Sequence, residues 1–245
     1  HNAWALAHTP HLDHYFASYP HTVLQASGGA VGLPDSQFGN SEVGHLTLGA
    51  GRILEQDLVR IANAIYDGSL VDQPAWQHMM HDTRRLHLIG MVSDGGVHSH
   101  IEHLLGILDL LRKANVEPVV HMITDGRDTS PKGALNYLAA LESSLARFDR
   151  AHIATVCGRY CAMDRANNWD RTQRAWEAML RGSGLKVDSA KAAIMEAYDR
   201  GEGDEFIQPT VLGEHAGIPD DEPVLFFNFR SDRARQLAAA VGLEH

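Results

Sequence analysis

The sequence contains few cysteines: Cys157 and Cys161 are the two in its 245 residues. A secreted fold stapled by disulfides needs more, and this pair without companion ligands does not have the spacing of a zinc site. No apolar run approaches the roughly 18 residues that a membrane-spanning helix needs, and no signal peptide is visible. These absences predict a cytoplasmic protein with reduced thiols and no membrane partner.

Basic charge is also in short supply. The chain has 21 lysines and arginines against 31 aspartates and glutamates, for a net charge of −10. A surface that binds nucleic acid needs a basic face, so the charge argues against a nucleic-acid partner. The remaining composition, 44% hydrophobic and 21% charged, is that of an ordinary globular protein. Its length allows one large domain or two modest ones.

Internal repeats and low-complexity segments are absent too, and the pattern that is present alternates strands with helices. Strands are predicted at residues 86–92, 118–123, 152–156 and 223–229, and helices at 101–114, 133–147, 169–180, 189–198 and 232–241. This order predicts an α/β fold with a mainly parallel sheet and helices on both faces. Residues 205–212 are predicted as a further strand at an edge, because Pro209 would interrupt a central ladder.

The first 55 residues do not follow this rhythm. They are predicted to hold a short helix or two, followed by "GLPDSQFGNSEVGHLTLGAGR" at residues 32–52. Glycines allow close approach of the backbone, so Ser41 could be a turn residue, a helix cap or a nucleophile. We expect residues 1–55 and 56–245 to form separate domains. The chain starts without methionine and stops after a helix-like run, so we expect a fragment.

Polar motifs follow each of the four main predicted strands. They are "SDGGVHSH" at 93–100, "TDGRDTSP" at 124–131, "CGRYCAMDRANNWDR" at 157–171 and "NFRSDRAR" at 228–235. The carboxyl ends of parallel strands meet at one edge of a sheet, where loops and helix N-termini converge on ligands. The sequence therefore predicts one binding site built from all four motifs.

Five arginines lie in these loops: Arg127, Arg159, Arg165, Arg230 and Arg233. Their guanidinium groups would repel one another unless an anion joined them, and arginine binds phosphate and carboxylate through paired N–H groups. The loops also carry Asp128, which could accept a substrate hydroxyl or hold an arginine, and His98, which ordinarily titrates in the range useful for proton transfer. A small ligand with phosphate and carboxylate groups fits this set.

Simpler structural roles are open to the same residues. Arg233 and Arg235 could be solvated helix residues, and Asp125 could be a turn residue. His98 could be structural, and Asp164 could cap a helix. The coincidence of four loops at one edge, with arginine in three of them, favours phosphate binding.

Seven stretches carry a family resemblance, in order from Gly32 to Leu237. They are the glycine-rich segment quoted above, "QDLVRI", "SDGGVHSHIEHL", "DGRDTSP", "GRYCAMDRANNWDR", "DEFIQPTV" and "FFNFRSDRARQL". In these motifs the chain resembles the cofactor-independent (2,3-bisphosphoglycerate-independent), metal-dependent phosphoglycerate mutases.

The resemblance implies an enzyme with a substrate-clamping transferase domain inserted in a domain similar to alkaline phosphatase. The latter holds two divalent metals, usually manganese. Residues 1–55 would be part of the metal and phosphoserine domain, and residues 56–245 an incomplete transferase domain. The implied reaction interconverts 3-phosphoglycerate and 2-phosphoglycerate through a phosphoserine intermediate, in a glycolytic enzyme that is a monomer.

Site residues carry over by position in the motifs. Ser41 matches the family's phosphorylated serine, which also ligates a metal. The positions that match substrate-binding residues are His98, Arg127, Asp128, Arg159, Arg165, Arg230 and Arg233. A serine hydroxyl is a weak nucleophile, and a divalent cation can deprotonate it at neutral pH.

The chain also departs from the family. Cys161 replaces a common tyrosine, and Asn168 replaces a common arginine. The family's first strand and C-terminal half, which supply most metal ligands and a catalytic lysine, have no counterpart here, so we expect this chain alone to be inactive. Two alternatives stay open: another phosphomutase or phosphatase of the alkaline-phosphatase superfamily, and a non-catalytic phosphometabolite-binding protein.

Overall fold

The computed structural model describes residues 3–35 and 37–242. The chain divides into two compact units, His1–Gln56 and Asp57–His245. In the part of the chain that is described, no helix is long and apolar enough to cross a membrane.

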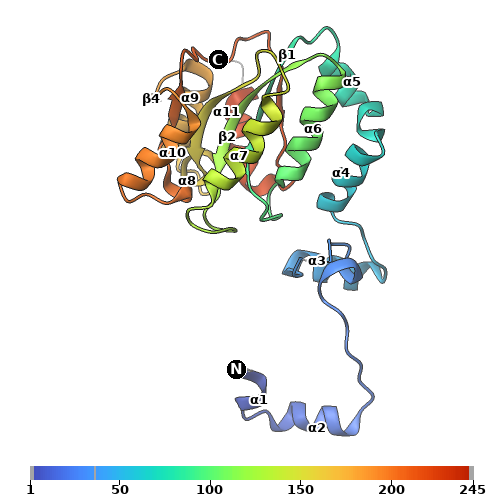
Figure 1. Cartoon of the computed structure of the whole chain (residues 1–245). Helices are drawn as coiled ribbons and strands as arrows, with labels where there is room; N and C mark the ends of the chain where they lie inside the picture. Colours follow the sequence, from blue (N-terminus) through green and yellow to red (C-terminus); the bar gives the residue numbers. More distant parts are fainter. Residues whose placement is uncertain (1–2, 36, 243–245) are drawn as a thin grey trace. The chain divides into compact units, whose positions relative to one another are not determined.

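The first unit consists of short helices and loops. Its elements are α1 (Ala3–Leu6), α2 (Pro10–Ser18), the 3₁₀ helix η1 (Gly28–Val31) and α3 (Ser41–Ala50) (Figure 1). A Cβ atom on Gly39 would lie 1.8 Å from the carbonyl oxygen of Ala26, and one on Gly32 would lie 1.9 Å from that of Leu54. These two glycines are therefore required where backbone packs closely on backbone within the unit.

The second unit is built on a six-stranded sheet. The strands lie in the order β4 (Leu185–Val187), β5 (Thr210–Leu212), β3 (His152–Gly158), β2 (Glu117–Thr124), β1 (Arg85–Met91) and β6 (Val224–Phe226). Every neighbouring pair is parallel except β3 and β5, which are antiparallel. The predicted α/β fold with a mainly parallel sheet is confirmed.

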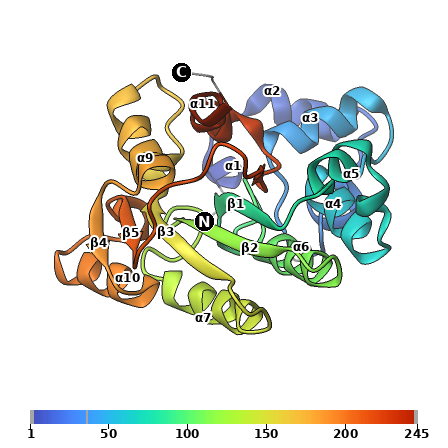
Figure 2. The ribbon, with the colours of Figure 1, turned by 90° about the horizontal axis from the view of Figure 1, so that it is seen from above.

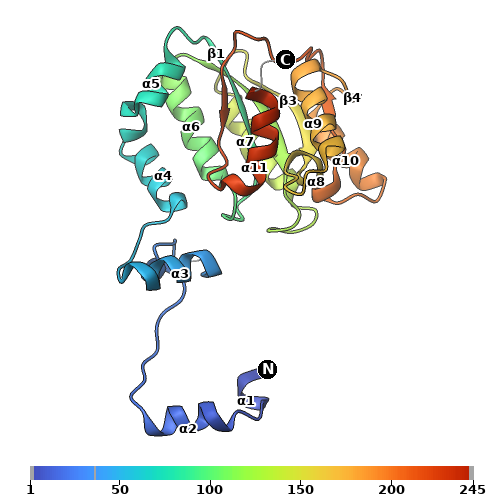
Figure 3. The ribbon, with the colours of Figure 1, turned by 180° about the vertical axis from the view of Figure 1, so that it is seen from behind.

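Helices cover both faces of this sheet. One layer holds α6 (Ile101–Lys113), α7 (Ala134–Leu145) and α10 (Ala190–Asp199), and the other holds α9 (Trp169–Arg181) and α11 (Ser231–Gly242) (Figures 2 and 3). Leu86 and Leu88 of β1 pack with the first layer, and Ile89 and Met91 pack with the second. Alternate residues of a strand point to opposite faces, so both faces of β1 are buried and mainly apolar, with His87 as a buried polar residue.

The predicted strands and helices are confirmed within a few residues, although β6 is shorter than the range 223–229. Several short elements were not predicted: α4 (Asp57–Tyr66), η2 (Ser69–Asp72), α5 (Pro74–Met80), β4, α8 (Arg159–Ala162) and η3 (Asp204–Phe206). Most of them are single turns or short segments whose apolar periodicity is too brief to stand out in the sequence.

The prediction of an edge strand at residues 205–212 is wrong in position. The strand formed there, β5, lies between β4 and β3. Pro209 precedes β5 by one residue, so its missing N–H lies outside the ladder, and its carbonyl accepts a bond from the Leu185 N–H (3.3 Å). Because β5 runs antiparallel to β3, the residues before β5 lie at the edge where the parallel strands end.

Candidate anion-binding site

Ion pairs join the loops that follow the parallel strands. Arg159, directly after β3, contacts Asp125, directly after β2, with a distance of 2.7 Å between Nη1 and Oδ1. Arg165 contacts Asp232, at the start of α11, with 2.7 Å between Nη1 and Oδ2. Motifs that lie far apart in the sequence are therefore neighbours at the carboxyl edge of the sheet.

Asp125 is the centre of this arrangement. Its buried carboxylate accepts hydrogen bonds from the Ser93 hydroxyl (2.7 Å), the Arg159 guanidinium (2.7 Å) and the backbone N–H groups of Arg127 (3.1 Å) and Asp128 (3.0 Å). Burial by itself would raise the pKa of Asp125, but these hydrogen bonds outweigh it and lower the pKa. Asp125 is a turn residue, as one alternative held, and it also fixes an arginine.

Arg159 is almost fully buried, with a side chain that is 3% exposed. Its Nη1 lies 2.7 Å from Asp125 Oδ1 and 2.6 Å from Asp128 Oδ2. Burial lowers the pKa of Arg159, but the two carboxylates outweigh burial and raise it. Of the two roles open to Asp128, the structure thus shows the one of holding an arginine.

Asp232 compensates two further arginines. Its carboxylate lies 2.7 Å from Arg165 Nη1 and 3.3 Å from Arg230 Nε. A third arginine, Arg127, has a different partner: its Nη1 lies 3.7 Å from Glu205 Oε1. The repulsion expected among the arginines is therefore offset for these three and for Arg159 without a ligand. Carboxylates of the protein lie between them.

Arg233 differs from the other four arginines. Its recorded hydrogen bond goes to the carbonyl oxygen of Met163 (3.2 Å), and within residues 3–35 and 37–242 no carboxylate pairs with it. Burial, together with the positive charges of Arg159, Arg165 and Arg127, lowers the pKa of Arg233. It is partly buried, unlike the exposed Arg235 two residues later, so it is not a solvated helix residue.

His98 is buried beside these groups. Burial and the positive charge of Arg159 lower its pKa to about 4, against the smaller opposite effects of Asp232 and Asp128. The expectation that His98 titrates near neutral pH is therefore wrong, because the buried ring is held neutral. His100 has a structural role, since its side chain accepts the Glu102 N–H (3.2 Å) and caps α6.

Ser41 lies in the first unit, at the first residue of α3. The cap of this helix is Asn40, whose side chain accepts the Val43 N–H (3.1 Å). Ser41 is exposed, and its hydroxyl lies 3.3 Å from His45 Nδ1. Asn40, and not Ser41, therefore caps the helix, so this role is excluded for Ser41.

Residues that could hold a metal are sparse. Apart from the stretches left undescribed, no group of three or more His, Cys, Asp or Glu side chains is placed to hold a metal ion. Ser41 and His45 together offer too few donors for the implied two-metal site. The described residues do not fit that site by themselves.

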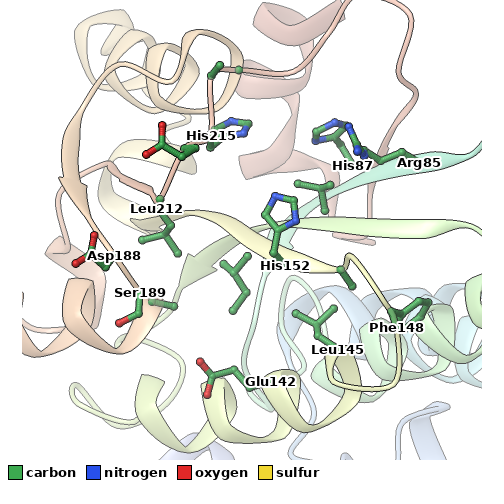
Figure 4. Close-up of a pocket in the computed structure, with 18 of the residues that line it drawn as sticks. Arg85, His87, Glu142, Leu145, Phe148, His152, Asp188, Ser189, Leu212 and His215 are labelled. Carbon is green, nitrogen blue, oxygen red and sulfur yellow. The ribbon is translucent and has the colours of Figure 1, made fainter.

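A cavity of about 770 Å³ lies at the opposite, amino edge of the sheet. Figure 4 shows His87, His152 and His215 around it, with Glu142 and Asp188 on the side of α7 and α10. None of the five arginines of the carboxyl edge lines it. The cavity and the arginines are thus separate features of the second unit.

Comparison with known proteins identifies the family of the chain. Residues 61–245 match the family model described as "BPG-independent PGAM N-terminus". The chain belongs to this family. The resemblance seen in the seven motifs is confirmed.

Relatives named 2,3-bisphosphoglycerate-independent phosphoglycerate mutase are similar over nearly the whole chain. The protein of Symbiobacterium thermophilum is 51% identical over 98% of this chain and 48% of its own length. That of Synechococcus sp. (strain JA-2-3B'a(2-13)) is 53% identical over 98% of this chain and 46% of its own length. The chain spans about half the length of the curated relatives it matches.

A solved structure agrees. A crystal structure of Leishmania mexicana phosphoglycerate mutase at low cobalt concentration has a TM-score of 0.85 and 32% identity, covering 98% of this chain and 47% of that one. That phosphoglycerate mutase carries the fold found here over the matched residues.

Two residues that pair with the arginines of this site were not recognised from the sequence. Asp232 and Glu205 stand within quoted motifs but received no role. A signal for Asp232 was present, since it lies between Arg230 and Arg233, and adjacent guanidinium groups need a carboxylate to hold them together. Glu205 could not be found in this way, because the antiparallel direction of β5 brings it to the site.

Proposed function

We propose that this chain carries the substrate clamp and the nucleophile of a 2,3-bisphosphoglycerate-independent phosphoglycerate mutase. The reaction would interconvert 3-phosphoglycerate and 2-phosphoglycerate. Residues 56–245 would be the transferase domain, inserted in an alkaline-phosphatase-like domain to which residues 1–55 belong. The family membership supports this proposal, and the site residues support it physically.

The observation that carries the proposal is the uncompensated charge of Arg233. Four arginines of the site have carboxylate partners, whereas Arg233 donates to a neutral carbonyl. Burial and three neighbouring positive charges lower its pKa, against a smaller opposite effect of Asp232. A phosphate or carboxylate of the ligand beside Arg233 would supply the missing charge through charge-assisted hydrogen bonds. The pairing of the other arginines holds them in place without filling this position.

Each remaining residue has a role consistent with this ligand. Arg127, Arg165 and Arg230 are partly exposed at the edge, so their free N–H groups can reach phosphate or carboxylate oxygens. Asp128 keeps Arg159 in place and can accept a hydroxyl of the glycerate. His98, buried and neutral, can hydrogen-bond the ligand without adding charge.

Ser41 would be the nucleophile that takes the phosphoryl group and returns it to the other hydroxyl. Its exposed hydroxyl at the N-terminal turn of α3 is accessible to a ligand, and the positive end of the helix dipole favours a phosphate there. We propose two divalent metals, manganese first, with the Ser41 oxygen as the ligand from this chain. When bound, such metals lower the pKa of the serine hydroxyl and offset phosphoryl charge.

The natural setting that we propose is a monomer in the cytoplasm acting on a small phosphate ester. The 245-residue chain by itself should show no mutase turnover with 3-phosphoglycerate and manganese in the absence of bisphosphoglycerate. Detectable turnover, lost in Ser41→Ala, would contradict the expected inactivity and identify the nucleophile.

The clamp is tested by titrating 3-phosphoglycerate into the chain in a calorimeter, with Arg233→Ala and Arg235→Ala as a matched pair on one helix. A charge-assisted hydrogen bond contributes about 1.5–3 kcal/mol, so Arg233→Ala should weaken binding roughly 10- to 100-fold. Arg235→Ala should leave the affinity within about twofold, because that side chain is exposed.

Three results would contradict the proposal. One is an equal loss of affinity for 3-phosphoglycerate in Arg233→Ala and Arg235→Ala. Another is that the parent chain does not bind 3-phosphoglycerate. The third is tighter binding of a phosphosugar than of phosphoglycerate, which would favour another phosphomutase or phosphatase of the superfamily.

A further inference from the structure

His98 and Asp232 face each other in the anion-binding site with unsatisfied atoms. His98 Nδ1 and Asp232 Oδ1 are buried and lie 3.5 Å apart. Among the described residues neither atom has a hydrogen-bond partner, although Arg230 Nε lies 3.3 Å from Asp232 Oδ1 in an ion pair. The other ring nitrogen of His98, Nε2, lies 4.0 Å from Asp128 Oδ2. Each ring nitrogen thus has one carboxylate in front of it.

Backbone contacts hold the two residues in this relation. The carbonyl oxygen of His98, in the loop after β1, accepts the N–H of Phe229, three residues before Asp232. The Asp232 carboxylate is fixed by Arg165 at 2.7 Å and Arg230 at 3.3 Å. The facing of Nδ1 and Oδ1 therefore follows from the fold as well as from side-chain rotamers.

A neutral imidazole carries one proton, on Nδ1 or on Nε2, and the hydrogen bond at one nitrogen decides which. An ionised carboxylate only accepts, so it attracts an N–H and repels a nitrogen lone pair. Burial raises the pKa of Asp232, but Arg230, His98 and Arg165 outweigh it and lower the pKa. Asp232 is thus an ionised acceptor at neutral pH.

The two carboxylates compete for the ring proton, and distance and pairing favour Asp232. Its oxygen is 3.5 Å from Nδ1, whereas that of Asp128 is 4.0 Å from Nε2. The same Asp128 oxygen already accepts a hydrogen bond from Arg159 at 2.6 Å, whereas Asp232 Oδ1 has a longer ion-pair contact of 3.3 Å with Arg230 Nε and accepts no hydrogen bond from the described residues. The stronger attraction lies on the Nδ1 side.

We propose that Asp232 is a positioning residue that holds His98 in the Nδ1–H tautomer, so that Nε2 offers a lone pair toward Asp128. A ligand hydroxyl between Nε2 and Asp128 would donate its proton to one of them. The identity of this hydroxyl, that of phosphoglycerate, rests on the function proposed above.

This arrangement also sorts the groups of a ligand. An ionised phosphate or carboxylate has no proton to donate and meets only acceptors between His98 Nε2 and Asp128. Its place is therefore with the guanidinium groups, while a hydroxyl is favoured beside the ring. Asp232 in this way contributes to specificity for a hydroxylated anion over a bare anion such as inorganic phosphate.

The tautomer is measured directly by long-range ¹H–¹⁵N NMR of imidazoles in the ¹⁵N-labelled chain at pH 7.5, with His98→Gln to assign the signals. The parent should show the Nδ1–H form. In Asp232→Ala, Asp128 is the remaining carboxylate in front of the ring, so the Nε2–H form should predominate. Asp170→Ala is the matched control, because Asp170 is an exposed aspartate in the first turn of α9 and should leave His98 unchanged.

An Nε2–H tautomer in the parent would overturn the proposal whether or not the variant folds. An Nδ1–H tautomer that persists in folded Asp232→Ala would overturn it as well. The signals of His87 and His121, at the opposite edge of the sheet, report whether the variant is folded.

Titration of 3-phosphoglycerate into the same samples tests the proposed function separately. A shift of the His98 signals by 3-phosphoglycerate and a smaller one by inorganic phosphate would support both proposals. Absence of any shift would contradict the proposed function while the tautomer still decides the role of Asp232.

Discussion

The two edges of one sheet bury polar groups in opposite ways. At the carboxyl edge the buried groups include ions, with Arg159 between Asp125 and Asp128, and the neutral ring of His98 lies beside them. At the amino edge they are neutral imidazoles: His87 Nδ1 lies 3.0 Å from His121 Nε2, and His121 Nδ1 lies 3.0 Å from Thr155 Oγ1. Burial lowers the pKa of His121 well below its usual value, and the neighbouring His87 lowers it further.

The hydrogen bonds at the amino edge have a consistent direction. Glu222 accepts from His87 Nε2 (2.7 Å), so His87 Nδ1 accepts from His121, and His121 Nδ1 accepts the Thr155 hydroxyl proton. This series of hydrogen bonds is complete with both imidazole rings neutral. At the carboxyl edge, by contrast, loops supply guanidinium groups and backbone N–H groups, so carboxylates stay ionised. The carboxyl edge thus keeps buried charges in ion pairs, whereas burial holds the imidazoles of the amino edge neutral.

We expect the greatest loss of stability when Asp125, at the charged carboxyl edge, is replaced. Asp125→Ala removes one carboxylate from buried Arg159 and the acceptor of two backbone N–H groups. Breaking a buried pair costs roughly 3–5 kcal/mol, and we expect the lower end because Asp128 remains. Urea unfolding of the parent and the variant measures the loss, and affinity for 3-phosphoglycerate should fall with it.

The control for this change is Asp220→Ala, at an exposed loop position. Its free energy of unfolding should stay within about 0.5 kcal/mol of the parent. Equal stability of the two variants would show that Asp125 does not organise the carboxyl edge.

The neutral imidazoles of the amino edge make the free energy of unfolding depend on pH. His87, His121 and His215 have pKa values below the usual 6.5, with burial as the main cause. The unfolded chain therefore binds protons that the folded chain does not, and stability should be full above pH 6.5 and fall as the pH drops below it. Each such histidine contributes at most about 1.4 kcal/mol per pH unit.

His121→Leu tests the same edge directly. His87 Nδ1 and Thr155 Oγ1 lose their partner, which should cost about 1–3 kcal/mol at pH 7.5. One titrating group is gone, so the fall in unfolding free energy between pH 6.5 and 5 should be shallower than in the parent. An exposed histidine of α5, changed as His78→Leu, should alter neither quantity. If the slope of unfolding free energy against pH were unchanged in His121→Leu, the hydrogen-bonded pair of His87 and His121 would not be the source of acid sensitivity.

The smallest change in the free energy of unfolding is expected for Arg85, an exposed arginine at the amino edge. Arg85 Nη1 lies 3.0 Å from Glu222 Oε1, but its side chain is 43% exposed against 3% for Arg159. An exposed pair contributes about 0–1 kcal/mol, so Arg85→Ala should change the free energy of unfolding by less than 1 kcal/mol. A loss as large as that of Asp125→Ala would mean that the amino edge depends on charge as well.

Much of the fold could be predicted from the sequence. The strand at residues 86–92 is an apolar run followed by "SDGG", and such local signals place β1, β2 and β3 within one or two residues. The convergence of Arg159 and Arg165 with the other loops followed from parallel strand direction. The position of β5 could not be predicted, because Pro209 argues for an edge only if it lies inside the ladder, and one residue of register decides this.

The site was predicted less completely, for a physical reason. Residue type and motif order in the sequence selected the arginines, His98 and Ser41, because each chemistry needs those side chains. The tertiary structure decided their state: carboxylates from Asp125 and Asp232 compensate the arginines, burial lowers the pKa of His98 to about 4, and Arg233 is left without a carboxylate. Hydrogen bonds and desolvation depend on groups such as Arg165 and Asp232, which are 67 residues apart in the chain. The sequence determined which groups are available, and folding determined which of them are paired, buried and charged.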